Sequence, residues 1–247
     1  MKSALITGGG SGIGLACARA LLDDDCKVTL MGRSEERIRA AAEQLGDGAS
    51  WVQGDVASEA DVQRAVEATP GIDVAVLAAG TGAGGPITMT TEADWSSTLA
   101  TNLTGAFFTI KHAGAAMAAN GGGSIVGLSS IAGVRTHRFM TAYCVSKAGL
   151  EMLVSNAADE MGPFGIRVNT VRPGLVPTEL SAGLANNKGI VDDYIEQMPV
   201  GRLGTVEDIA AAVRYLAGPE SGWVTGVHLS VDGGMHLRRG PWLDRAT

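Results

Sequence analysis

Seven short apolar runs recur along the chain, and longer segments whose apolar residues follow helical spacing separate them. The runs are nearly continuous in apolar residues rather than alternating with polar ones, as in strands that helices cover on both faces. They span residues 4–7, 27–31, 50–53, 74–77, 124–128, 167–171 and 227–231. This alternation predicts an α/β fold, a doubly wound (Rossmann) seven-stranded parallel sheet with helices on both faces.

The 247 residues show no composition shift that marks a linker and no repeat at solenoid spacing, so we predict one domain over 1–247. Aromatic residues make up only 4% of the chain, which suits helices packed closely on a parallel sheet. The most irregular stretch runs from about 175 to 200, after the sixth predicted strand. It is either a substrate loop at the ligand-binding edge of the sheet or an ordinary exposed connection.

Charge and cysteine content exclude several classes of protein. The net charge is -7 and no run of Lys or Arg provides the basic stripe that nucleic acid requires. Cys17, Cys26 and Cys144 are odd in number and lack metal-ligand spacing, as expected of reduced thiols without a metal. No signal peptide precedes the first strand and no apolar run reaches membrane-spanning length, so we expect a cytoplasmic protein with no membrane partner.

A glycine-rich turn follows the first predicted strand and opens a helix near Ile13. Gly8, Gly12 and Gly14 allow a tight turn, close approach of the backbone to a pyrophosphate, and close helix packing. Such a turn alone is weak support, because glycines end many strands. The predicted dinucleotide contacts are Thr7, Gly8, Gly10, Ser11, Gly12, Ile13 and Gly14.

The end of the second predicted strand indicates which dinucleotide binds. An acidic residue there bonds the adenosine ribose of NAD and repels the 2′-phosphate of NADP. Here the strand ends Met31-Gly32-Arg33-Ser34 with no carboxylate, and Arg33 and Ser34 offer donors to a phosphate. The sequence favours NADP (NADPH) over NAD, unless Arg33 is only a solvated residue at a helix start.

Tyr143 and Lys147 stand four residues apart in a helical pattern that spans about 141–161, so their side chains share one helix face. The ordinary pKa of a tyrosine is near 10. For the tyrosine to ionise near pH 7, its pKa must fall by about 3 units, which corresponds to roughly 4 kcal/mol. An adjacent ammonium and an oxidised nicotinamide can supply this. The pair is common by chance, but Ser129 and Ser130 follow the fifth predicted strand, where the reactive end of a cofactor should lie.

These motifs resemble, in order and spacing, those of the short-chain dehydrogenase/reductase family. The family's glycine turn is similar to residues 7–14, and its Tyr-x-x-x-Lys motif to Tyr143 and Lys147. Its catalytic serine, thirteen residues earlier, falls on Ser130 rather than Ser129. Asn102 matches the fourth member of the family's tetrad, and the resemblance covers nearly the whole chain, with features of the 3-oxoacyl-(acyl-carrier-protein) reductase subgroup.

The same resemblance implies further cofactor contacts, with Asp55 at the adenine amino group and the segment after the sixth strand at the nicotinamide carboxamide. The implied residues are Asp55, Val56, Ala79, Gly80, Pro173, Gly174, Val176 and Thr178. One departure is Leu77-Ala-Ala-Gly80, where the family commonly has Asn-Asn-Ala-Gly. Ala78 cannot make the hydrogen bonds of that asparagine, so we expect an effect on stability rather than on chemistry.

The resemblance implies an NADP(H)-dependent oxidoreductase that moves a hydride between the nicotinamide and a small carbonyl or alcohol compound. Tyr143 transfers the proton, Ser130 binds the substrate oxygen, Lys147 binds the nicotinamide ribose, and Asn102 holds a water. The alternatives are a 3-oxoacyl thioester reductase, an NAD-dependent sugar, polyol or alcohol dehydrogenase, and a non-catalytic nucleotide-binding regulator. Against the first, the segments 117–123 and 163–165 have no basic residues to dock an acidic carrier protein.

Two interpretations stand for each group of residues near the expected substrate cleft. His137 and Arg138 are interpreted as a solvated loop more readily than as cleft residues. Met140, Leu180, Leu184 and Met198 form either an apolar pocket or plain core. The family also implies a homo-oligomer, a dimer or tetramer, through helices that begin near Trp95 and Thr141. In the C-terminal extension 235–247, Trp242 and Leu243 are either a subunit contact or a frayed tail.

Overall fold

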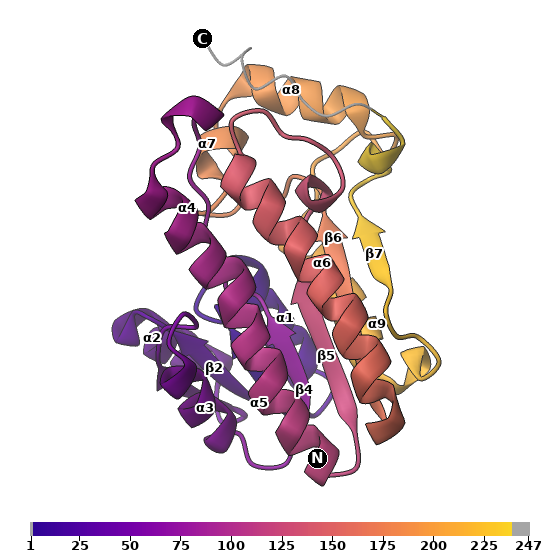
Figure 1. Ribbon diagram of the computed structural model, residues 1–247. Helices are drawn as coiled ribbons and strands as arrows, with labels where there is room; N and C mark the ends of the chain where they lie inside the picture. Colours follow the sequence, from indigo (N-terminus) through magenta and orange to yellow (C-terminus); the bar gives the residue numbers. More distant parts are fainter. Residues whose placement is uncertain (1, 239–247) are drawn as a thin grey trace.

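A computed structural model describes residues 2–238, whose seven strands form one parallel sheet in the order β3-β2-β1-β4-β5-β6-β7 (Figure 1). The strands are β1 Ser3–Thr7, β2 Lys27–Gly32, β3 Ala49–Gln53, β4 Ile72–Leu77, β5 Gly123–Leu128, β6 Ile166–Pro173 and β7 His228–Val231. Each predicted strand is present and its ends differ by at most two residues. The doubly wound parallel sheet is therefore confirmed.

Helices cover both faces of the sheet. Helices α1, α2 and α9 pack on one face and α3, α5 and α6 on the other, each group with its own apolar core (Figure 1). The bounds are α1 Gly12–Leu22, α2 Glu35–Leu45, α3 Glu59–Glu67, α4 Glu92–Leu99, α5 Gly105–Ala119, α6 Thr141–Met161, α7 Ala182–Ala185, α8 Lys188–Gln197 and α9 Val206–Ala217. Strands between two such layers are buried on both faces, which explains their continuous apolar runs.

Local sequence sets where several helices begin. A hydroxyl side chain accepts a hydrogen bond from the third helical residue at the start of α2, α3, α4 and α9. Such caps satisfy a backbone donor that has no partner inside the helix. Thr205 and Asp208 complete a reciprocal capping box at α9. The helices therefore start at residues that the sequence itself marks.

A third, smaller apolar core lies beyond the carboxyl ends of the strands, where α7 and α8 cover the sheet edge (Figure 1). Its buried members are Ile131, Leu175, Ile190, Tyr194, Met198 and Met235. Helices α7 and α8 lie in the irregular stretch predicted at 175–200, so that stretch is partly helical rather than a plain loop. It stands at the sheet edge where doubly wound proteins bind ligands.

A short helical turn, Met235–Leu237, lies near the end of the described residues. The predictions for Trp242 and Leu243 lie outside the described residues. Within residues 2–238, no helix combines the length and apolar character needed to cross a membrane. The same part of the chain holds no group of three His, Cys, Asp or Glu side chains placed to bind a metal.

Candidate functional site

A cavity of about 740 Å³ opens at the carboxyl ends of the strands, below α7 and α8. It brings together residues from the glycine turn, from the loops after β4 and β5, from α6 and from the segment after β6. The predicted residues that line it are Gly8, Ser11, Gly12, Ile13, Gly14, Ala79, Gly80, Ser130, Tyr143, Lys147, Pro173, Gly174, Val176 and Thr178. Residues far apart in sequence thus meet around one elongated site.

Close packing explains why the turn after β1 is glycine-rich. Gly8 has a φ of +67°, and a Cβ added there would lie 2.7 Å from the backbone N of Ala79. A Cβ on Gly14 would lie 2.3 Å from the carbonyl oxygen of Gly8. Both distances are far below normal contact, so any other residue would force the turn and the loop after β4 apart.

The start of α1 suits an anion. The N-cap residue Ser11 makes no side-chain capping bond, and the first turn of the helix contains no acidic residue. The first backbone N–H groups of α1 therefore point toward the cavity without a side-chain partner, and the helix dipole adds positive potential. Thr178 lies opposite, 3.4 Å from the position of a Cβ on Gly12. This cradle fits the pyrophosphate of a dinucleotide.

Thr7 fastens the turn to the neighbouring strand. Its hydroxyl accepts a hydrogen bond from the backbone N–H of Ala79 at 3.3 Å and its carbonyl accepts one from Ala78 at 3.2 Å. Ala78, which replaces the asparagine common in the family, packs against the apolar core of α1 and α9. Backbone bonds from Thr7 and apolar packing thus hold the loop that an asparagine side chain would otherwise steady.

Tyr143 and Lys147 lie one turn apart on α6 as predicted; Lys147 is buried, and Tyr143 is partly buried and lines the cavity. The Lys147 Nζ lies 5.5 Å from the centroid of the Tyr143 ring and donates a 2.7 Å hydrogen bond to the carbonyl of Leu128. Ser130 has an extended backbone, and its hydroxyl accepts a hydrogen bond from the N–H of Ala132 at 3.1 Å. Tyrosine, serine and lysine therefore converge on one end of the cavity.

Burial acts on both ionisable groups. Burial raises the pKa of the Tyr143 hydroxyl, and an interaction with the Ser130 hydroxyl lowers it by less. Burial lowers the pKa of Lys147 from 10.5 to about 8. The protein groups alone therefore oppose ionisation of Tyr143, so a low tyrosine pKa requires the positive charge of an oxidised nicotinamide in addition to the ammonium.

The buried Lys147 predicts how stability depends on pH in the ligand-free protein. Between about pH 8 and 10.5 the unfolded chain keeps the lysine proton that the folded chain has lost, so unfolding becomes less favourable as pH rises. Relative to Lys147→Met, the wild-type free energy of unfolding should rise by about 3 kcal/mol across that window. Urea denaturation of both proteins at several pH values measures this, and a constant difference between them would contradict it.

Asn102 lies beside this end of the cavity in a π-helical turn, Ala100–Thr104, that joins α4 to α5. Its Oδ1 accepts a hydrogen bond from the N–H of Thr81, and its Nδ2 donates to the Thr81 carbonyl and to the Ser146 hydroxyl. A Cβ on Gly80 would lie 3.7 Å from Asn102 Oδ1 and 3.8 Å from Lys147 Nζ. The fourth residue of the predicted tetrad therefore lies close to Lys147.

A buried ionic network behind the site was not foreseen from sequence. Glu151, one turn after Lys147 on α6, accepts 2.7 Å bonds from the Ser129 hydroxyl and from both Nε and Nη2 of Arg172. Burial alone would raise the pKa of Glu151, but the bonds from Arg172 and Ser129 lower it. The network anchors the strand end that carries Ser130. The only sequence signal was the four-residue spacing from Lys147.

The residues predicted to contact the adenosine part of the dinucleotide lie outside the cavity. Arg33 is exposed, and its guanidinium has no partner within residues 2–238. Ser34 caps α2 by accepting a hydrogen bond from the N–H of Arg37. Asp55, next to Val56 after β3, accepts a hydrogen bond from the N–H of Ala57. The structure thus leaves the Arg33 side chain available to a ligand.

Arg37 is a neighbour of this region that sequence analysis missed. Its Nη1 lies 2.6 Å from Glu179 Oε2, and its Cγ lies 3.3 Å from the position of a Cβ on Gly10. The ion pair joins α2 to the segment that follows Thr178. Both side chains are exposed, so the pair alone contributes little stability. Its partners are 142 residues apart, and no local pattern could reveal it.

The interpretation of His137 as part of a solvated loop is wrong. Its side chain is buried and lines the cavity, because the loop before α6 folds back over α8. Met140, Leu180 and Leu184 also line the cavity, as the pocket interpretation expected. Met198 instead packs in the small core under α8.

The two segments expected to dock a carrier protein lie at the wrong end of the molecule. Residues 117–123 and 163–165 precede β5 and β6, so they lie at the amino ends of the strands, opposite the cavity. The exposed Arg135 and Arg138 flank the cavity residue His137 instead. The absence of basic residues in the two segments therefore says nothing about docking.

Comparison with known proteins gives one consistent answer. The sequence model of a family described as enoyl-(acyl carrier protein) reductase matches residues 8–236. A 3-oxoacyl-(acyl-carrier-protein) reductase of Chlamydia muridarum is 34% identical over 242 residues, covering 95% of this chain and 97% of that protein. A galactitol 2-dehydrogenase (L-tagatose-forming) of Cereibacter sphaeroides is 35% identical over 237 residues, covering 94% and 93%.

Solved structures agree with the sequence relatives. A short-chain type dehydrogenase/reductase from Mycobacterium ulcerans has a TM-score of 0.96 and 36% identity, covering 99% of this chain and 93% of that one. A gluconate 5-dehydrogenase from Burkholderia cenocepacia, solved with NADP and tartrate, has a TM-score of 0.91 and 30% identity, covering 95% of each chain. With matches over nearly its whole length, this chain belongs to the short-chain dehydrogenase/reductase family, whose members are oxidoreductases that bind a nicotinamide cofactor.

Proposed function

We propose that this protein is an NADP(H)-dependent oxidoreductase acting on a small carbonyl or alcohol compound. The observation that carries the proposal is the convergence of Ser130, Tyr143 and Lys147 on a cavity whose other end is the glycine turn. A nucleotide-binding regulator without turnover would not need a tyrosine in the cavity paired with a buried lysine. The segment 175–200, with α7 and α8, forms the substrate side of this cavity, in a domain that spans the whole chain.

When bound, the nicotinamide supplies or accepts the hydride. In the reduction direction Tyr143 donates its proton to the oxygen of the carbonyl group as negative charge develops there. The Ser130 hydroxyl donates a hydrogen bond to the same oxygen and orients it. Lys147, rotated from its bond with the Leu128 carbonyl, holds the nicotinamide ribose and stabilises the phenolate of Tyr143.

Asn102 and Lys147 then return the proton. The Asn102 side chain lies beside Gly80, close to the Lys147 ammonium, and can hold a water that connects the lysine to solvent. Tyr143 is reprotonated through this route after each turnover. Oxidation of an alcohol runs the same steps in reverse, with Tyr143 as the base.

The choice of NADP(H) depends on Arg33, whose guanidinium is unpartnered in the described residues and which follows β2 where that strand ends at Gly32 rather than at a carboxylate. A related gluconate 5-dehydrogenase was solved with NADP, which supports the same choice. The nearby Arg37 adds a second positive charge, but Glu179 neutralises it. We propose that a 2′-phosphate competes with Glu179 for Arg37.

Cofactor binding tests this choice. Arg33→Ala should weaken NADPH binding by about 10- to 100-fold, the equivalent of a charge-assisted hydrogen bond, and leave NADH binding within about twofold. Glu179→Gln, which frees Arg37 and keeps the side-chain shape, should tighten NADPH binding a few-fold. Fluorescence titration with both nucleotides measures these changes. Tighter binding of NADH by the wild type would instead favour an NAD-dependent sugar, polyol or alcohol dehydrogenase.

A 3-oxoacyl thioester reductase is the second candidate. It is favoured by the carrier-protein reductase among the relatives and by the exposed Arg135 and Arg138 beside the cavity. Positive side chains at a cavity mouth suit an acidic carrier protein. Including an acetoacetyl thioester in the substrate panel separates the two candidates.

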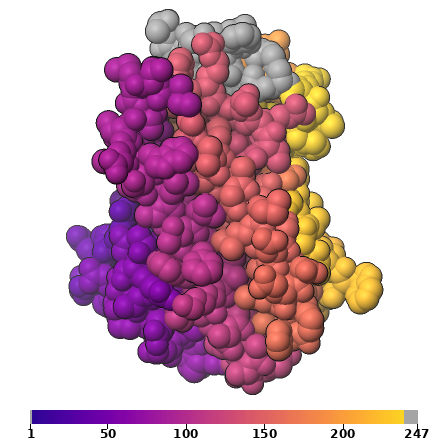
Figure 2. Space-filling model, in the orientation of Figure 1, coloured from indigo at the N-terminus to yellow at the C-terminus, as the bar shows by residue number. Residues whose placement is uncertain are grey.

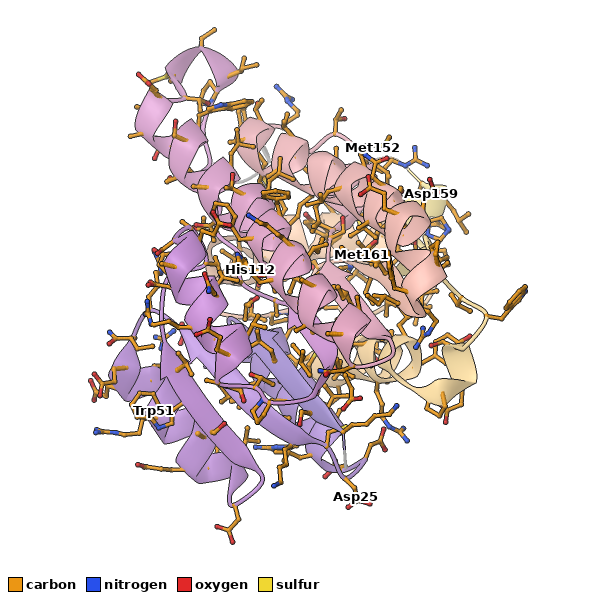
Figure 3. All side chains as sticks on the ribbon, turned by 60° about the horizontal axis from the view of Figure 1, so that its bottom comes forward. Asp25, Trp51, His112, Met152, Asp159 and Met161 are labelled. Atoms are coloured by element: carbon orange, nitrogen blue, oxygen red, sulfur yellow. The ribbon has the colours of Figure 1, made fainter. Side chains whose placement is uncertain are left out.

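We propose that the protein is a homo-oligomer in the cytoplasm, a dimer or tetramer. Helices α5 and α6 lie side by side and form a broad outer face (Figure 2). Phe107, Val145 and Met152 on this face are 45%, 43% and 64% exposed. Figure 3 shows Met152 directed outward from α6, whereas Met161 lies beside α5, where Gly114 leaves room for it. An apolar face of this kind supports a subunit contact.

A further inference from the structure

The part of the cavity beyond Ser130 and Tyr143 is enclosed mainly by apolar side chains, among them Met140, Leu184 and Ile190. Of the described residues that line the whole cavity, only Lys147 and Glu179 carry a full charge at neutral pH. Neither belongs to this far compartment, since Lys147 lies under Tyr143 and Glu179 pairs with Arg37. The compartment therefore suits an uncharged molecule.

His137 places a hydrogen-bond acceptor in this apolar wall. Its Nδ1 lies 3.1 Å from the carbonyl oxygen of Arg135, which only accepts, so Nδ1 carries the proton. Burial lowers the pKa of the ring, and the bond to Arg135 raises it by less, so the imidazole is neutral at pH 7. Its Nε2 therefore has a free lone pair.

Tyr194 of α8 brings a second polar side chain to the same wall of the cavity. The ring centroids of His137 and Tyr194 are 6.4 Å apart, and both residues are buried and line the cavity. Within residues 2–238, neither His137 Nε2 nor Tyr194 Oη has a hydrogen-bond partner, yet the only fully enclosed side-chain atom lacking one is Gln197 Oε1. The two atoms are therefore open to the cavity.

Two polar atoms that face the cavity without a protein partner are free to bind a polar group of a ligand. Burial raises the pKa of the Tyr194 hydroxyl and Tyr143 raises it further, and both tyrosines line the same cavity. A substrate hydroxyl can donate to His137 and accept from Tyr194 at once. A carbonyl or carboxylate oxygen cannot donate to His137.

We propose that His137 and Tyr194 recognise a hydroxyl group, and that the substrate is an uncharged hydroxy-carbonyl compound, or the matching diol in the oxidation direction. This inference rests on the proposed function, because it assumes that Tyr143 marks the reacting carbon. It makes His137 and Tyr194 specificity-determining residues that contact the substrate away from the bond that reacts.

The test compares alcohols that differ by one hydroxyl. Oxidation of pentan-2-ol, pentane-2,3-diol and pentane-2,4-diol with NADP is followed by absorbance. We expect kcat/KM for at least one diol to exceed that for pentan-2-ol by 10-fold or more, because a site built around a hydroxyl rejects the analogue that lacks it. Equal kcat/KM for all three compounds would overturn the inference, and the proposed function would still stand.

Variants assign the preference to the two residues. Tyr194→Phe removes one oxygen, His137→Phe removes the acceptor, and each should lower the diol preference at least fivefold while kcat/KM for pentan-2-ol stays within about threefold. His137→Gln, which restores an acceptor, should recover part of it. Met140→Leu, a cavity residue without a hydrogen-bonding group, should leave the preference unchanged. A preference that survives in both phenylalanine variants would also overturn the inference.

Failure of the proposed function gives a different result. If no compound turns over, saturation-transfer NMR of the protein with NADP reports binding directly. A diol signal that exceeds that of pentan-2-ol and is lost in Tyr194→Phe and His137→Phe supports the hydroxyl site without any reaction. Equal signals from the diols and pentan-2-ol contradict it.

Discussion

Tyr143→Phe should abolish nearly all turnover, lowering kcat by about 100-fold to 10,000-fold, the range that a positioned general acid contributes. The substitution removes one oxygen and keeps the ring, which packs near the Lys147 ammonium. Dissociation constants for NADPH should therefore change less than about threefold. Steady-state kinetics and fluorescence titration of the same preparation measure both quantities.

The matched control is Tyr215→Phe, which makes the same change at a half-exposed tyrosine on α9, away from the cavity. It should retain wild-type kcat. If Tyr143→Phe kept a substantial part of the activity, the proton would have to come from another group, and the role assigned to Tyr143 would be wrong.

Gly14→Ala should weaken NADPH binding by about 100-fold or more and lower the melting temperature. The added methyl group would lie 2.3 Å from the Gly8 carbonyl oxygen, and because the backbone fixes both positions, rotating a side chain cannot relieve the overlap. The turn must open, which displaces the N–H groups at the start of α1 from the position that fits a pyrophosphate.

Gly162→Ala provides the control for Gly14→Ala. At Gly162, after α6, an added Cβ meets nothing within 4 Å and the backbone has a φ of -52°. This variant should bind NADPH normally and unfold at the wild-type temperature or slightly above it. Circular dichroism confirms that each variant is folded, and normal NADPH affinity in Gly14→Ala would refute the cradle.

Features that depend on local pattern were predictable from sequence. Buried strands produce apolar runs, and the i, i+4 spacing on α6 brings Tyr143 and Lys147 together without any knowledge of the rest of the fold. The order of the motifs along a doubly wound sheet then places Ser130 at the same edge. Strand ends were less accurate, since β6 continues to Pro173, where pairing with Val231 of β7 extends it.

Features that depend on contacts between distant segments were not predictable. The burial of His137 depends on α8, and the ion pair of Arg37 joins α2 to a segment 142 residues later. The buried Glu151 looks like any helix-surface glutamate until β6 brings Arg172 beside it. In each case the partner comes from another element, and no local periodicity reports it.

The small core under α7 and α8 is separate from the two cores that hold the sheet. Substitutions in it can therefore reshape the substrate wall without disturbing the strands or the glycine turn. Such a division lets descendants of one ancestor acquire new substrates at little risk to folding.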